Sequence, residues 1–290
     1  MRVYPLPIPT RLVGGEAVNS YSGRHARNNG LDRQDVEAAL RQAGKFPKSR
    51  SKNHPDRIAV WRALGNLHPR AFTEPQVVAG NWVIDRPLCE RCMPAHEHGW
   101  GRLPWVGWVC LKHKRWIKGG QQVGLARFGE ALVAERHWRG SLARRGVLVD
   151  SPLVRLAEEA ATVGISKAVL AERAERVDRH SPGLLVYPET VSLARLISRP
   201  SFLDSMLGDA TSRWKWGMVE REVRSILPDA EDAEAWRALA RVWDFVLDLQ
   251  AMVRDAQWLG VAAEDRWNAL QYSRLAEAES GRRPGVDERV

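Results

Sequence analysis

The sequence predicts a mainly α-helical fold, in which helix-turn-helix units are joined to a small cysteine-bearing module and followed by a helical carboxy-terminal region. Three observations lead to this prediction. Two amphipathic segments meet at Gly30, all three cysteines lie between residues 88 and 116, and apolar residues recur at helical spacing through most of the chain after residue 121. With 290 residues, of which 44% are hydrophobic, the chain is long enough to bury more than one core.

The first two helices are expected over residues 16–29 and from residue 33 onward. Gly30 between them suits the left-handed conformation that ends a helix. Asp32 is placed to cap the second helix, whose sequence RQDVEAALRQAG presents its apolar residues on one face. A basic loop and a short helix with the sequence DRIAVWRALG are expected to follow.

The cysteines form a metal-binding pattern. Cys89-x2-Cys92 is followed after 17 residues by Cys110-x2-His113, and each x2 spacing lets a tight turn aim two ligands at one ion. Four such ligands close a tetrahedron and leave no position for a catalytic water. We therefore predict one structural zinc ion in a zinc-ribbon-like zinc finger, which stabilises a module with little core of its own.

Two further histidines, His96 and His98, are alternative ligands. One of them could replace His113, or the two could bind a second ion. The set with His113 is favoured because its spacing mirrors that of the first cysteine pair, and a second ion is not expected. A nucleophilic cysteine is disfavoured because three clustered thiols indicate shared coordination.

Basic and aromatic residues surround the predicted metal site. The basic residues would form an edge that can meet phosphates, although a solvated face is an equally good explanation. The tryptophans can stack on bases, but in so small a module we expect them to form the core around the metal. The basic residues are Lys112, Lys114, Arg115 and Lys118, and the tryptophans are Trp100, Trp105, Trp108 and Trp116.

Two segments, residues 26–32 and 160–166, carry the pattern of a helix-turn-helix: Ala, three residues, Gly, an apolar residue and a capping residue. Ala lets the two helices approach, and Gly supplies the positive φ of the turn. A compact helical corner that does not read DNA is the alternative for both. The residues expected to contact nucleic acid or a partner are Arg33, Gln34 and Arg41 in the first unit, and Lys167 and Arg173 on or near the exposed face of the second.

The net charge of +9 is unevenly distributed. Before Gly120 there are 20 lysines and arginines against nine acidic residues, a net charge of +11, whereas the rest of the chain carries −2. A concentrated positive field attracts polyanions, so nucleic acid is the leading partner class and plain solubility is the alternative. No segment has the character of a membrane span or signal peptide, and clustered cysteines fit a reducing compartment, so we expect a cytoplasmic protein without a membrane partner.

Four parts are predicted from these features. Residues 1–75 form a helical part with the first helix-turn-helix candidate, residues 76–120 form the zinc-finger module, residues 121–280 form a helical domain with the second candidate, and residues 281–290 form a disordered tail.

The opening LPIPTRLVGGEAVNSYSGRHARNNGL resembles the start of TniQ-domain proteins, which have a Pro-rich lead, GES and a helix and turn similar to SYL-x-RLA-x-x-NGL. The family continues with Cys-x2-Cys, an apolar stretch that contains Trp, and Cys-x2-His. Cys89, Cys92, the stretch LPWVGWVC and His113 follow that order. The matching positions of the opening are Gly15, Glu16, Ser20, Tyr21, Arg24, Ala26, Asn29, Gly30 and Leu31.

This resemblance covers residues 4–118 and has two departures. Ala17, Val18 and Gly23 replace residues more usual in the helix, and MPAHEHGW follows the second cysteine where acidic or Gly residues are common. These departures affect the expected partner contacts more than the expected fold.

The resemblance implies a role in transposon target-site selection. TniQ proteins are non-catalytic adaptors: TnsD-type members read a chromosomal attachment site, and others join a CRISPR effector complex in CRISPR-associated transposons. Both types pass the location to an AAA+ ATPase regulator that recruits the transposase. The implied partners are therefore DNA or a CRISPR ribonucleoprotein and a TnsC-like AAA+ ATPase, and a homodimer is left open.

Two other functions compete with this one. The basic front of the chain, which is the segment before Gly120 with a net charge of +11, and the two helix-turn-helix candidates also fit another function. This function is a free-standing, zinc-containing, sequence-specific DNA-binding regulator. A nuclease that uses His96 and His98 on a metal is the third hypothesis, but the sequence offers no convergent carboxylate set or Gly-rich phosphate loop.

Overall fold

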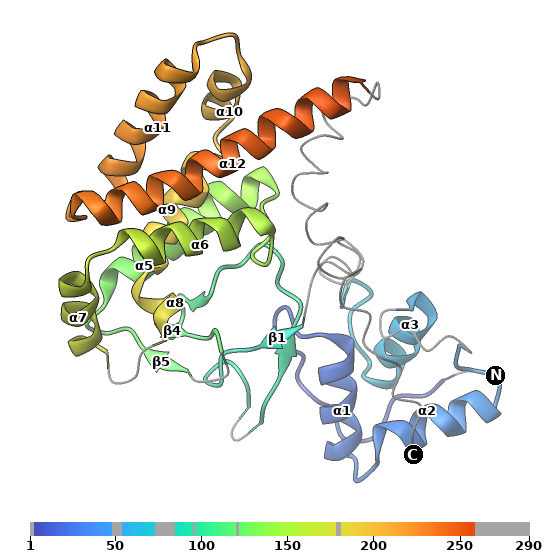
Figure 1. The fold of residues 1–290 in the computed structure, drawn as a ribbon. Coiled ribbons are helices and arrows are strands. Elements are labelled where there is room, and N and C mark those ends of the chain that lie inside the picture. Colours follow the sequence, from blue (N-terminus) through green and yellow to red (C-terminus); the bar gives the residue numbers. More distant parts are fainter. Residues whose placement is uncertain are drawn as a thin grey trace, which may run out of the picture. The chain divides into compact units, whose positions relative to one another are not determined.

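Figure 1 shows a computed structural model of the chain, which describes residues 3–47, 54–72, 85–94, 97–119, 122–177 and 181–258. The described chain is mainly helical with a few two-residue strands, which confirms the predicted helical class. It divides into two compact units. Unit 1 holds the described residues up to 104 together with those from 117 to 122, and unit 2 holds residues 105–116 and the described residues from 123 onward.

Within the described residues, unit 1 contains three helices and one small antiparallel sheet. Gly30 has a φ of +71° between the first two helices, and Asp32 caps the second by accepting a hydrogen bond from the backbone N–H of Gln34 at 2.6 Å. Both features were expected from the sequence. The elements are α1 (Val18–Asn28), α2 (Arg33–Gln42), α3 (Pro55–Leu64), β1 (Arg86–Pro87) and β2 (Trp100–Gly101).

The helices of unit 1 enclose an apolar core that includes Tyr21, Ala26 and Trp61, none of which is exposed to solvent. A buried carboxylate, Glu37 on α2, ties α2 to α3. It accepts hydrogen bonds from the Nη2 of Arg57 at 2.7 Å and the indole N–H of Trp61 at 3.1 Å. One acidic side chain on α2 therefore fixes the packing of two neighbouring helices.

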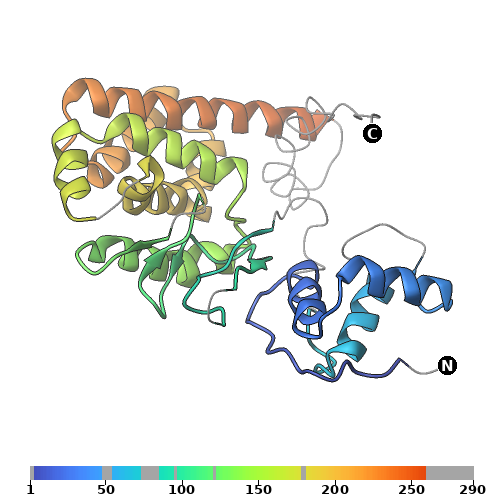
Figure 2. The same ribbon diagram turned by 90° about the horizontal axis from the view of Figure 1, so that it is seen from below.

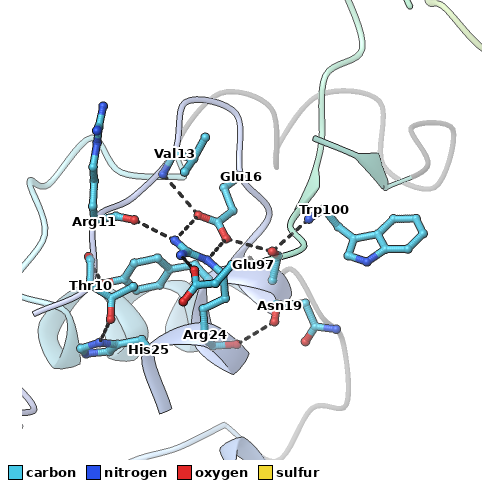
Figure 3. Close-up of polar contacts among 12 residues, drawn as sticks. Thr10, Arg11, Val13, Glu16, Asn19, Arg24, His25, Glu97 and Trp100 are labelled. Atoms are coloured by element: carbon cyan, nitrogen blue, oxygen red, sulfur yellow. Dashed lines mark hydrogen bonds and ion pairs between the residues drawn. The ribbon is translucent and has the colours of Figure 1, made fainter. Parts of the chain in front are cut away.

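A second buried ion pair attaches the start of the chain to α1, as Figure 3 shows. Arg24 is 1% exposed and Glu16 is 2% exposed, and the Nε of Arg24 lies 2.8 Å from a carboxylate oxygen of Glu16. The guanidinium also donates to the backbone oxygen of Arg11 at 2.7 Å and meets the carboxylate of Glu97. The carboxylate of Glu16 accepts from Ser20 at 2.9 Å. The network satisfies both buried charges, as such a pair requires.

Unit 2 begins with a three-stranded antiparallel sheet in the order β3, β4, β5, in which Cys110 faces Arg115 and Trp116 faces Val123. Helices follow to the end of the described chain. The elements are β3 (Val109–Cys110), β4 (Arg115–Trp116), β5 (Val123–Gly124), α5 (Gly129–His137), the π-helix η2 (Trp138–Leu142), the 3₁₀-helix η3 (Ala143–Arg145), α6 (Pro152–Gly164), α7 (Lys167–Glu175), α8 (Pro182–Leu185), α9 (Tyr187–Ile197), α10 (Pro200–Leu207), α11 (Ser212–Ile226) and α12 (Asp232–Trp258).

The core of unit 2 lies between long helices. α6 packs against α9 on one side and α12 on the other, and both views show α12 running along α6 (Figures 1 and 2). Small residues permit this approach, because a side chain at Gly164 would collide with Leu227 and Ala238. No helix in the described ranges has the length and apolar character that a membrane span needs.

The boundaries of the two units differ from the predicted domain boundaries. Residues 76–120 were expected to form one module, but Val109 and Trp116 join the helical core of unit 2, whereas Leu88 and Met93 pack with Val13 in unit 1. The short strands have too little apolar surface for a core of their own, so each packs on adjacent helices or loops. The predicted tail at residues 281–290 lies outside the described residues.

Candidate metal centre

The structure brings together the four residues that the spacing predicted as ligands. One donor atom from each of Cys89, Cys92, Cys110 and His113 lies within 4.8 Å of the others. The Sγ of Cys110 is 3.7 Å from the Nδ1 of His113, so this ring nitrogen is turned toward the cluster. As whole residues, Cys89 is buried and Cys92, Cys110 and His113 are half-buried. The four side chains could therefore hold one metal ion.

The first pair of ligands lies on a tight turn. The backbone N–H of Cys92 donates to the backbone oxygen of Cys89 at 2.8 Å, which brings the two thiols to one side. Gln122 brackets this turn: its amide nitrogen donates to the backbone oxygen of Leu88 at 2.7 Å, and its amide oxygen accepts from the N–H of Glu90 at 2.9 Å. A single side chain thus holds both ends of the segment that carries Cys89.

The second pair lies on the hairpin between β3 and β4. Cys110 ends β3 and His113 stands in the connecting loop, which closes at Lys114 with a φ of +49°. This left-handed conformation is uncommon for a residue other than glycine. The backbone oxygen of Lys114 accepts a hydrogen bond from the N–H of Leu125 at 2.9 Å, which holds the loop in this conformation.

Glu135 on α5 holds the strand that leads to Cys110. Its side chain is fully buried, and its two carboxylate oxygens accept hydrogen bonds from the backbone N–H groups of Gly107 at 3.1 Å and Val109 at 3.2 Å. The same carboxylate accepts from the Nε of Arg139 at 2.6 Å and the hydroxyl of Tyr187 at 2.7 Å. Four donors converge on this buried group, and two of them belong to the segment that leads to Cys110, Gly107 just before β3 and Val109 within it.

Arg139 and Tyr187, which both donate to Glu135, also contact the residues around Cys110 themselves. Arg139 reaches past Glu135 and donates to the backbone oxygen of Val109 at 3.1 Å, so Val109 is held through both its N–H and its carbonyl. Tyr187 also packs edge-on against Trp116, with ring centroids 5.0 Å apart. Gly107 is required here, since a Cβ at this position would collide with Glu135 and Tyr187.

The electrostatics of Glu135 reflect its burial. Desolvation raises the pKa of its carboxyl group above the usual range, and the charge and hydrogen bonds of Arg139 and the hydroxyl of Tyr187 oppose this rise. The ionised carboxylate thus depends on its partners. Removing a partner raises the free energy of the charged form and loosens the strand before Cys110.

The other described histidine and the basic residues of this region differ in their exposure to solvent. His98 is exposed and does not belong to the four-residue cluster, and His96 lies outside the described residues. Lys112 and Lys114 are exposed on the hairpin loop, as a basic edge requires. The two remaining residues of the predicted edge, Arg115 and Lys118, are half-buried.

The tryptophans were expected to form a core around the metal, and the structure shows that one of them does not. Trp116 is 1% exposed and belongs to the core of unit 2, as predicted, and Trp105 and Trp108 are half-buried. Trp100, in contrast, is 51% exposed, so it does not form part of a core around the metal. It lies on β2, where its backbone N–H donates to the hydroxyl of Ser20 at 3.0 Å and its ring extends away (Figure 3).

The candidate partner residues of the first helix pair lie on α2. Gln34 is exposed. Arg33 donates to the side chain of Asn19 at 2.6 Å and lies 3.7 Å from Glu37, while Arg41 lies 3.8 Å from Glu37 and over the ring of Phe46. Both arginines therefore have partners within unit 1, and their side chains remain 27% and 44% exposed. Their contact with nucleic acid stays a prediction.

In the second helix pair, Lys167 is exposed at the start of α7, as expected. The expectation for Arg173 was wrong: its side chain is 13% exposed, and both terminal nitrogens pair with the carboxylate of Glu189 at 2.7 Å. It also donates to the backbone oxygen of Leu185 at 2.6 Å. The acidic partner on α9 is 16 residues away, so the sequence pattern of α7 alone did not reveal it.

Comparisons with known proteins add nothing to these assignments: no family model, curated protein or solved structure matches the chain. The residues that sequence reasoning missed are those around the ligands, chiefly Gln122, Glu135 and Tyr187. One signal was present in the sequence. Glu135 falls on the same helical stripe as Ala131 and Trp138, both fully buried, and a charge on an apolar stripe indicates a buried partner.

Proposed function

We propose that the four-residue cluster binds one structural zinc ion. Three thiolates and one imidazole are ligands that zinc prefers, and zinc–ligand bonds of about 2.0–2.3 Å in a tetrahedron place neighbouring sulfur and nitrogen donors about 3.6 Å apart. The 3.7 Å between the Sγ of Cys110 and the Nδ1 of His113 fits this value. Four protein ligands complete the coordination, so the ion would contribute folding free energy and would activate no water.

We further propose that the protein is a non-catalytic adaptor for transposition target selection, which links target DNA or a CRISPR effector complex to an AAA+ ATPase regulator. The observation that carries this proposal is the combination of two elements in one order: a helix pair turned at Gly30, followed by the Cys89, Cys92, Cys110 and His113 cluster. Either element alone occurs in many proteins. Their succession is what resembles the TniQ family.

The contacts of the motif residues support this proposal. Glu16, Ser20 and Arg24 form the buried network of unit 1, so three of the positions that match the family motif serve the fold. Asn29 matches as well, and its side chain accepts from the N–H of Ile8 at 2.8 Å and donates to the carbonyl of the same residue at 2.9 Å. These residues hold the Pro-rich N-terminal segment on α1. Because they serve the fold, members of a family could share this motif even where their partners differ.

The exposed residues define where partners would bind under this proposal. Gln34 and Leu31 near the start of α2, Lys112 and Lys114 on the hairpin loop and Lys167 on α7 remain accessible to a nucleic acid or protein. The first four belong to the basic front of the chain, whose charge favours a polyanion. We assign the ATPase to a separate surface, since an adaptor must contact both partners at once.

Affinity purification of the full chain from its own host, at moderate salt, tests this function. Recovery of an AAA+ ATPase, with or without a CRISPR ribonucleoprotein, is the expected result. His113→Ala should lose these partners along with the metal, and His98→Ala, outside the cluster, should keep both. If the metal-loaded protein retains neither an ATPase nor a target complex, the adaptor proposal is wrong.

The second candidate is a free-standing DNA-binding regulator with a structural zinc. The excess of +11 charges before Gly120 and the helix pairs α1–α2 and α6–α7 favour it. This function predicts tight and sequence-selective duplex binding by the protein alone, with an affinity that falls steeply as salt increases. Recovery of one defined DNA fragment without an ATPase would favour this candidate over the adaptor.

A further inference from the structure

A hollow on the surface of α11 lies in unit 2, which as a whole lacks the basic excess of the front of the chain. It is lined by one side of the first three turns of this helix and by the residue that caps it. The lining residues are Thr211, Arg213, Trp214, Gly217, Met218 and Arg221. None of the described residues that line the hollow is acidic, so a bound anion would meet no carboxylate among them.

The two tryptophans of α11 have different environments. Trp216 packs against Trp236 and Trp243 on α12, with ring centroids 5.3 and 5.1 Å apart, so it fixes α11 on its neighbour. Trp214 is 52% exposed and has no aromatic or cationic partner within the described ranges. Gly217 stands one turn later, where a Cβ would meet no atom within 4 Å. The indole of Trp214 therefore has open space beside it.

The two arginines of the hollow carry uncompensated charge. Arg213 and Arg221 are exposed, and neither has an ion-pair or hydrogen-bond partner in the part of the chain that the structure describes. The two acidic residues of α11 are occupied elsewhere: Glu220 pairs with Arg224 at 3.2 Å and Glu222 pairs with Arg199 at 2.9 Å. The field at the hollow is thus locally positive.

We propose that this hollow binds single-stranded nucleic acid, with one base stacked on Trp214 and the backbone phosphates held by Arg213 and Arg221. The arginines are two helical turns apart, about 12 Å along the helix axis. A strand stacked at the 3.4 Å rise of B-form DNA would span this length with about three to four nucleotides. An aromatic face between two cations is the arrangement by which proteins bind single strands without reading their sequence.

A duplex fits this hollow less well than a single strand. In a duplex the bases stack on one another, so the face of Trp214 would have no base to contact unless the DNA were kinked. An acidic peptide would satisfy the arginines but would leave the same face unused. The proposal goes beyond the adaptor function, because none of its residues belongs to unit 1 or to the metal cluster.

The test is fluorescence anisotropy with a labelled oligothymidylate of about 15 nucleotides, within the range of one binding site. Trp214→Ala should weaken binding about ten-fold, and Trp214→Phe should restore most of the affinity because it keeps an aromatic face. The double variant Arg213→Gln with Arg221→Gln should lower the slope of log affinity against log salt by about 1.4, since each phosphate on a single strand contributes about 0.7.

Matched controls separate this site from the basic front of the chain. Arg241→Gln removes an exposed charge of unit 2 outside the hollow, and Trp100→Ala removes a tryptophan of similar exposure in unit 1. Both should leave the affinity for the oligothymidylate nearly unchanged. Circular dichroism should show that every variant is folded, because all substituted side chains are exposed.

Cross-linking locates the bound strand. An oligonucleotide with one 5-iodouracil, irradiated in complex with the protein, should attach to the peptide that contains Trp214. Three outcomes would overturn the proposal. The strand could attach only to peptides of residues 3–47, or Trp214→Ala could leave the affinity for the oligothymidylate unchanged. Trp214→Ala could also lose as much affinity for a duplex of the same length as for the single strand. Each can occur while the ATPase and the metal are still bound, so failure here is distinct from failure of the adaptor function.

Discussion

The carboxylate of Glu135 accepts a hydrogen bond from the backbone N–H of Val109 at 3.2 Å, one residue before the metal-ligand candidate Cys110. Through this bond, a helix of unit 2 sets the position of one of the four ligands. Arg139 holds the carbonyl of Val109 at 3.1 Å from the same helix, so the strand has little freedom to move the thiol. Residues that hold a ligand in this way influence metal affinity without touching the ion.

Glu135→Gln should destabilise unit 2 and weaken metal binding together. The amide offers one acceptor oxygen where the carboxylate offers two, and its NH2 group would face N–H donors. We expect a loss of about 1–3 kcal/mol in the free energy of unfolding and about a ten-fold increase in metal transfer to a competing chelator. Urea unfolding and a colorimetric chelator measure the two effects. Glu159→Gln, on the exposed side of α6, is the control and should change neither.

Arg139→Gln should cost more stability at high pH than at low pH. Burial raises the native pKa of Glu135, so the contribution of this group is fully present below the unfolded pKa of about 4.3 and is lost as pH rises through the native pKa. Arg139 lowers that native pKa, and its removal therefore increases the loss. Because the Arg139 side chain is 39% exposed, the extra cost should be about 1 kcal/mol.

Urea midpoints at pH 5 and pH 8, measured on metal-loaded protein, check this expectation. Arg136→Gln removes a neighbouring exposed charge of the same helix and should behave alike at both pH values. A constant difference between wild type and Arg139→Gln across this range would show that Arg139 acts only through its bond to Val109.

The metal content should be one ion per chain, and it should depend on His113. His113→Ala removes a ligand, so we expect metal retained after dialysis to fall well below one equivalent and the melting temperature to drop. His98→Ala should retain one equivalent, because His98 is exposed and outside the cluster. Elemental analysis of the dialysed proteins distinguishes these cases. Loss of the ion in His98→Ala, with retention in His113→Ala, would reverse the ligand assignment.

Arg24→Met should destabilise unit 1 strongly. It leaves the carboxylate of Glu16 buried without its counter-charge, which typically costs about 3–5 kcal/mol. Arg27→Met, three residues later and exposed on the same helix, should cost less than about 0.5 kcal/mol. Chemical unfolding measures both. Equal stability of the two variants would mean that the buried pair contributes nothing beyond the packing of its side chains.

Local structure and the members of the metal cluster could be predicted from neighbouring residues in the sequence. Gly30 predicted a left-handed turn, Asp32 predicted a cap, and the structure contains both. The x2 spacing identified Cys89, Cys92, Cys110 and His113 because a tight turn depends only on neighbouring residues. Periodicity likewise predicted the long helices of unit 2, since apolar spacing reflects the face that is buried.

The pairing of charged side chains far apart in the sequence depends on the tertiary fold and could not be predicted in this way. Arg173 was expected on or near the exposed face, yet it pairs with Glu189 on another helix. Glu135 likewise accepts hydrogen bonds from backbone N–H groups 26 and 28 residues away. Helical periodicity shows which side of a helix is buried, but it does not identify the group on the opposite element. The unit boundary inside residues 76–120 has the same origin, because short strands pack on whichever core the fold brings next to them.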